Sequence, residues 1–175
     1  MQPPPLFANP QAPLEARRQL LLPSRPDPEA ARFLLTHTGG PAKGFSAESP
    51  LSLTALAVIA TGHAEARGLA QDPTLYGARL AEGERAELVL TPAPGCVTVV
   101  AHGGLGVMEI DSFVVDGPAD SPRVIGQDDR AGPVAVVGGQ GACVALGGGA
   151  PRIIVIVRRG GGPVMMGVFR GDRPL

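Results

Sequence analysis

Few residues of this chain have the types and spacing that chemistry requires. Its three histidines, His37, His63 and His102, stand alone, without the H-x-x-x-H or His-Glu spacing of metal and acid–base sites. No G-x-S-x-G segment is present, and the serines lie in predicted loops or helix caps: Ser24, Ser46, Ser49, Ser52, Ser112 and Ser121. A Ser-His-Asp triad can assemble from distant positions. A small hydrolase therefore stays an alternative, but the sequence favours a protein that is not an enzyme.

Acidic residues supply the best candidate metal ligands. Asp111, Asp128 and Asp129 lie near predicted turns, as do Asp116 and Asp120. Two or three carboxylates on neighbouring loops, together with backbone carbonyl groups, bind Ca²⁺. Aspartate is also a common turn former that faces water. The sequence therefore predicts no cofactor, with calcium at these carboxylates as the alternative.

The two cysteines, Cys96 and Cys143, each stand at the start of a predicted strand, just after a turn. Similar positions on two strands can place the thiols opposite one another, which predicts a disulfide and an oxidising compartment. The alternative is two buried thiols that act as small hydrophobic side chains. A zinc site would need more ligands than these cysteines and three scattered histidines offer.

A glycine-rich segment, VAVVGGQGACVALGGGAP at residues 134–151, raises the question of a phosphate-binding loop. The dinucleotide pattern G-x-G-x-x-G is broken at Val144, and no lysine follows Lys43 to complete a Gly-Lys-Ser/Thr loop. The residues after Gly141 are typical of a strand, not of a helix whose N-terminus would bind phosphate. These glycines are therefore predicted to form turns of a sheet.

The predicted secondary structure changes along the chain, from helices in the first part to strands in the second. Residues 1–48 read as a proline-rich arm with short helices at 13–22 and 27–40, and residues 49–175 as one domain. A helix is predicted over 50–72, capped by Ser49, with a kink or close packing at Gly62. From Tyr76 onward, short alternating segments closed by Gly, Pro or Asp predict about seven to nine strands. The predicted fold is mainly β, an antiparallel, jelly-roll-like β-sandwich preceded by a helix.

Two later segments resemble one another. VTVVAHGGLGVMEI at 97–110 and IVIVRRGGGPVMMGV at 154–168 each join two apolar strands through a glycine cluster, and VAVVGGQGACVAL is a looser third version. Glycine adopts positive φ without steric cost, which many hairpin turns require. Three β-hairpins are therefore predicted.

Composition narrows the classes of partner. Fifteen basic and sixteen acidic residues leave a net charge of −1, and aromatic residues make up 3% of the chain. Nucleic-acid binding needs a basic face or aromatic platforms, so it is not expected. No stretch reaches the roughly 18 apolar residues of a membrane span, and the N-terminus lacks the apolar core of a signal peptide. The sequence predicts either a cytoplasmic protein or a mature piece of a longer chain.

The arm carries too many large apolar side chains for a disordered tail. We expect it to dock on a protein surface, with a second subunit favoured over the arm's own sandwich. The residues concerned are Leu6, Phe7, Leu14, Leu20, Leu21, Leu22, Phe33, Leu34 and Leu35.

The segments LAEGERAELVLTPAPGCVTVVAHGGLGVMEID, GQDDRAGPVAVVG, ACVALGGGAPRIIVIV and GGGPVMMGVF resemble the bacterial pre-peptidase C-terminal type of domain and related β-sandwich modules. The resemblance covers residues 78–170 and rests on Gly83, Gly95, Val107, Asp111, Asp128 and Gly167. It implies a non-catalytic module of a secreted or envelope protein that binds proteins or surfaces. The alternatives are a structural subunit that self-assembles through its arm, and a small hydrolase.

Overall fold

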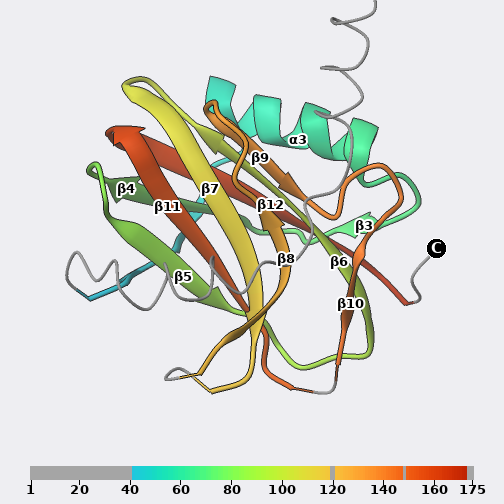
Figure 1. Cartoon of the computed structure of the whole chain (residues 1–175). Coiled ribbons are helices and arrows are strands. Elements are labelled where there is room, and N and C mark those ends of the chain that lie inside the picture. The colour runs from blue at the N-terminus through green and yellow to red at the C-terminus, as the bar shows by residue number, and fades with distance from the viewer. Residues whose placement is uncertain (1–40, 119–120, 148, 173–175) are drawn as a thin grey trace, which may run out of the picture.

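The computed structural model describes residues 41–118, 121–147 and 149–172. The predicted helices of the arm lie outside the described residues, as do Ser24, His37 and Asp120. The described chain is mainly β, with two sheets stacked face to face and one helix, α3, on the outside of the second sheet (Figure 1). This confirms the predicted sandwich with a preceding helix.

Twelve strands and one helix follow one another along the described residues. The first elements are β1 (Lys43–Gly44), β2 (Ser46–Glu48), α3 (Leu53–Glu65), β3 (Ala70–Gln71), β4 (Leu75–Leu80) and β5 (Arg85–Val89). The others are β6 (Gly95–Gly103), β7 (Val107–Asp116), β8 (Arg123–Asp128), β9 (Val134–Val137), β10 (Val144–Leu146), β11 (Arg152–Gly160) and β12 (Gly162–Gly171).

Strands near the two ends of the described chain pair with each other, and strands nearer its middle pair with each other in turn. One sheet has the order β1-β5-β11-β7-β8, and the other has the order β10-β6-β12-β4-β2, with β9 also on β6 and β3 also on β12. The first long strand pairs with the last (β4 with β12), the second with the next to last (β5 with β11), and β7 pairs with β8. This nested pairing is that of a jelly roll. All pairs are antiparallel except that of β1 with β5, which is parallel.

The core lies between the two sheets and consists mainly of aliphatic side chains. Along β5, the alternation in ERAELV places Ala86 and Leu88 in this core and Arg85 and Glu87 on the outer face. The fully buried residues include Leu80, Leu90, Val97, Val99, Ile110, Val114, Ile153, Val155, Val157, Val164, Met166 and Val168. Their burial fixes the strand register, because a shift by one residue would turn them all outward.

Helix α3 begins later and ends earlier than predicted. Its N-cap is Ser52, whose hydroxyl oxygen accepts from Ala55 N at 3.0 Å, and not Ser49. It ends at Glu65, because the left-handed backbone at Gly68 (φ 80°) turns the chain back into β3. The predicted close packing at Gly62 is confirmed, since a methyl group there would overlap the ring of Phe169 in β12.

The three predicted hairpins are wrong. β6 and β7 lie in different sheets, as do β11 and β12, and β9 and β10 both pair with β6 instead of with each other. The two glycine clusters at 103–106 and 160–162 are corners at which the chain crosses from one sheet to the other. They lie against each other, with Gly161 N donating to Gly106 O at 3.0 Å. The similarity between residues 97–110 and 154–168 therefore reflects two adjacent corners.

Candidate interaction surface

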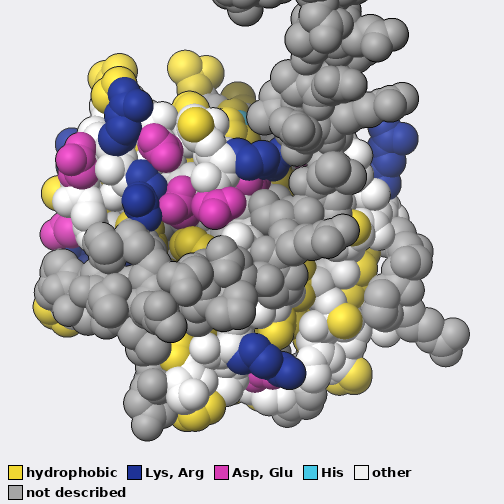
Figure 2. Space-filling model, in the orientation of Figure 1, with side chains coloured by type: hydrophobic (Ala, Val, Ile, Leu, Met, Phe, Trp, Pro, Cys, Tyr) yellow, Lys and Arg dark blue, Asp and Glu magenta, His cyan; other side chains and the backbone are white. Residues whose placement is uncertain are grey.

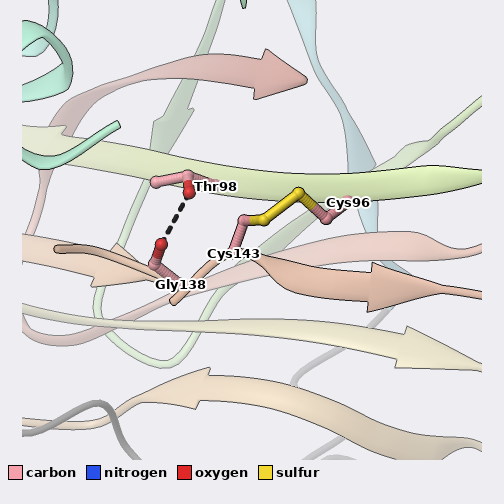
Figure 3. The surroundings of a disulfide bond; sticks show 4 residues. All are labelled: Cys96, Thr98, Gly138 and Cys143. Atoms are coloured by element: carbon pink, nitrogen blue, oxygen red, sulfur yellow. Dashed lines mark hydrogen bonds between the residues drawn. A yellow bond between two sulfur atoms is a disulfide. The ribbon is translucent and has the colours of Figure 1, made fainter. Parts of the chain in front are cut away.

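The two cysteines form the predicted disulfide. Cys96 lies in β6 and Cys143 directly precedes β10, which pairs with β6 in antiparallel register. Their Cα atoms are 5.5 Å apart, and Cys96 is buried. Beside the bridge, the Thr98 hydroxyl donates to Gly138 O at 2.6 Å and holds the turn after β9 on β6 (Figure 3). The bridge therefore fixes the edge of the seven-stranded sheet and serves structure.

The glycines around the bridge form turns, as predicted. Gly138 and Gly141 have φ values of 76° and 78°, and Gln140 between them has 54°. No helix starts here among the described residues, since β10 follows at Val144. A phosphate-binding helix N-terminus is therefore absent from this segment.

Asp128, one of the candidate metal ligands, forms hydrogen bonds with its own loop and with β9. Its carboxylate accepts from Arg130 Nε at 2.7 Å, Arg130 Nη2 at 2.5 Å and Val136 N at 2.8 Å. A buried carboxylate is stable only with such partners. The group therefore holds the β8–β9 connection in place, while Asp129 next to it is exposed.

Asp111, a second candidate ligand, lies on the outer face of β7 and is almost completely buried. Its Oδ2 is 3.4 Å from Arg158 Nη1, and its Oδ1 has no hydrogen-bond partner among the described residues. Burial raises the pKa of Asp111 to about 6, although Arg158 acts in the opposite direction. Across residues 41–118, 121–147 and 149–172, no three His, Cys, Asp or Glu side chains are grouped so that they could hold a metal ion. Calcium binding by these carboxylates therefore stays an alternative.

The described histidines and serines do not converge on one site. The His102 ring Nε2 lies 2.9 Å from Thr61 Oγ1 between sheet and helix, where burial lowers the pKa of His102. His63 is exposed in the last turn of α3. Ser112 is buried in the core without a hydrogen-bond partner among the described residues, and Ser52 caps α3. These side chains serve packing and capping.

A pocket of about 460 Å³ lies where β4 turns into β5. It is lined by Lys43, Arg79, Leu80, Ala81, Glu84, Gly161 and Gly162. Lys43 Nζ donates to Glu84 Oε2 at 2.6 Å, and the same oxygen accepts from Ala81 N at 2.7 Å. The bond from Ala81, followed by Lys43, lowers the pKa of Glu84. The ion pair of Lys43 and Glu84 therefore ties β1 to the turn.

The most unusual feature of the surface is a group of exposed leucines at one end of the sandwich. Two belong to the first turn of α3, one directly precedes the helix cap, and one lies at the tip of the β6–β7 corner. We call Leu51 (87% exposed), Leu53 (86%), Leu56 (52%) and Leu105 (95%) the leucine patch. Hydrophobic side chains gather at this end of the molecule in Figure 2, above the start of α3 and the β6–β7 corner.

The leucines of the patch lie where the start of α3 meets a glycine corner. Leu51 and Leu56 stand at N′ and N4 of the helix, where a hydrophobic staple would pack them together, yet Leu51 remains exposed. The glycine corner pushes Leu105 to its tip, because Gly106 adopts a φ of 92°. Gly104 allows the corner to lie against the helix, since a side chain there would be 3.2 Å from Thr54 Oγ1. The patch therefore joins two segments that are far apart in the sequence.

The sequence did not single out this patch. Helical spacing groups Leu51 with Ala55 and Val58, which are buried, but Leu51 lies before the first residue of α3 and is exposed. Leu105 stands alone in GGLG, where a large apolar residue between turn glycines is the one signal that could have marked it. The sequence could not show that the start of α3 lies beside this corner in the folded protein.

No protein-family model matches this sequence, and no curated protein is significantly similar to it. The resemblance to the pre-peptidase C-terminal type of domain therefore stays a prediction. Within the described part of the chain, no helix is long and apolar enough to span a membrane.

Proposed function

We propose that this chain is a non-catalytic interaction module that binds another protein through the leucine patch. The exposure of the four leucine side chains is the observation on which this proposal rests. Burying a leucine side chain is worth about 1.5–3 kcal/mol, and apolar residues gathered on a surface mark contact sites more often than scattered ones do. A rigid jelly roll presents such residues in a fixed arrangement, which limits the conformational entropy lost on binding.

The disulfide supports a place for this module in an oxidising compartment, at the cell envelope or outside the cell. Disulfides persist there, whereas reducing systems keep cytosolic thiols free. The cytoplasm remains the alternative, and the bacterial origin implied by the sequence resemblance belongs to the same proposal.

The patch can be tested with a hydrophobic dye. We expect the variant Leu53→Asp/Leu105→Asp to bind several-fold less dye than the parent while keeping the same far-ultraviolet spectrum. Val89→Asp is the matched control, because Val89 is 63% exposed and lies at the other end of the sandwich. Equal dye binding by parent and double variant would show that the leucines do not form an accessible apolar surface.

Self-assembly is the second candidate, because the four exposed leucine side chains can pack against the same surface of a second copy in a two-fold arrangement. In that case the parent forms an oligomer in sedimentation equilibrium that Leu53→Asp/Leu105→Asp dissociates. A parent that stays monomeric at every concentration removes this candidate and leaves the first.

A further inference from the structure

The outer face of the five-stranded sheet carries an apolar cluster of its own. Its members come from β7, β8 and β11 and point away from the other sheet. They are at most 7% exposed, and we call them the outer cluster: Phe113, Val115, Val124, Ile154 and Ile156. Helix α3 packs on the opposite sheet, on β6 and β12. The outer cluster therefore needs a different cover.

Two polar atoms beside the outer cluster also lack partners. Arg152 Nη2 and Asp111 Oδ1 are both buried, and neither has a hydrogen-bond partner among the described residues. Both side chains lie on the outer face, because Arg152 is in register with Val115, and Asp111 with Ile156. Buried polar groups of native proteins are almost always hydrogen-bonded. The cover should therefore supply both apolar side chains and backbone donors and acceptors.

We infer that residues 1–40 of the same chain lie across the outer face of the five-stranded sheet and bury the outer cluster. The segment contains nine Leu and Phe residues, enough to cover five buried side chains. It leads directly into β1, and β1 pairs with β5 at the edge of this very sheet.

The distance to be covered is short. Neighbouring strands lie about 4.8 Å apart, so the path from β5 across β11 and β7 to β8 is roughly 15 Å. About five extended residues span that distance, which leaves most of the 40 residues to pack on the face. Docking on the chain's own sheet costs less entropy than recruiting a second copy, because the segment is already tethered there. The sandwich then has cover on both sides, α3 on one sheet and residues 1–40 on the other.

A tryptophan reporter tests this in the full chain, which contains no natural tryptophan. In the variant Phe113→Trp we expect short-wavelength emission and little quenching by acrylamide. Adding Leu20→Asp/Leu21→Asp/Leu22→Asp should shift the emission to longer wavelength and increase quenching several-fold. Val89→Trp is the matched control on the same face, and its emission should be unaffected by the arm substitutions.

Three outcomes would overturn the inference. Free quenching of Phe113→Trp in the otherwise unchanged chain would show that the face is open. An arm substitution without effect would assign the cover to something else. Shielding that disappears on dilution would assign it to a second copy.

If Phe113→Trp does not fold, dye binding by chains with the natural outer cluster decides the question. The triple arm variant should bind more dye than the parent, whereas Arg17→Asp/Arg18→Asp in the same segment should not. Equal dye binding by the triple variant and the parent would overturn the inference.

Discussion

At the scale of single residues, the fit between helix and sheet depends on Gly62. Its missing side chain lets α3 lie directly on the Phe169 ring in β12. We expect Gly62→Ala to destabilise the protein by about 1–3 kcal/mol, although alanine favours a helix by about 1 kcal/mol. Gly44→Ala is the control, because a methyl group at Gly44 would meet nothing within 4 Å, and it should leave the free energy of unfolding nearly unchanged. Denaturant unfolding of both variants measures this. A stabilised Gly62→Ala would contradict the packing described.

The buried Asp111 carboxyl group predicts a pH dependence with a defined sign. Its folded pKa of about 6 lies above the ordinary 3.8, so the folded state binds the proton more tightly than the unfolded state. The stabilisation from this group is complete at low pH and is lost as the pH rises through about 6. Relative to Asp111→Asn, the parent should therefore lose about 1–3 kcal/mol of unfolding free energy between these two pKa values.

Unfolding at several pH values measures this difference between the two chains. Glu48→Gln, the same change at an exposed position on β2, should keep the slope of the parent. A parent and an Asp111→Asn variant that run parallel across the range would show that Asp111 is not perturbed by burial.

At the scale of elements, the Cys96–Cys143 bridge holds β10 on the edge of the seven-stranded sheet. We expect Cys96→Ser/Cys143→Ser to lose about 2–4 kcal/mol of stability, because the unfolded chain is no longer constrained. Reduction of the parent should lower its melting temperature in the same way. Two titratable thiols in denatured, unreduced protein from an oxidising compartment would contradict the bridge.

The elements also show what the sequence could reveal. Alternation in ERAELV predicted a strand and its inward face correctly, because burial on one side of a sheet imposes a period of two. The β-branched run RIIVIV predicted a strand, but not its faces, because both of them are buried. The partner of each strand could not be predicted, since a glycine corner between sheets has the same local sequence as a hairpin turn. The start of α3 was misplaced because Ser49 and Ser52 are equally good caps, and only tertiary packing selects between them.

The candidate site was harder to predict than the fold. Carboxylates near turns suit calcium, which made Asp111 and Asp128 candidate ligands, yet each is paired with an arginine. The partner of Asp111 lies on the neighbouring strand β11, and that of Asp128 lies two residues along its own loop. Strand register places Arg158 beside Asp111, and loop conformation places Arg130 beside Asp128. Neither feature can be predicted from the local sequence. The cysteine pair was predictable because both cysteines stand at the start of a strand.

At the scale of the whole molecule, the described chain is a jelly roll with α3 on one sheet and the leucine patch at one end. The patch combines the beginning of the helix with the corner between the sheets, so it exists only in the folded protein. Its position leaves both sheets free to be covered by the chain itself. The end of the sandwich, not a cleft or a charged face, is therefore the proposed place of contact.

Site-specific photo-cross-linking tests this claim most directly. The photoreactive residue p-benzoylphenylalanine is placed at position 105 or, as the control, at position 123. Arg123, the first residue of β8, is well exposed and pairs with Asp116 at the end of β7, far from the β6–β7 corner. On irradiation in the cells that express the chain, we expect a discrete adduct from position 105 that Leu53→Asp abolishes, and no such adduct from position 123. The same adducts from both positions, or none from position 105, would contradict the proposal that the leucine patch is the contact surface.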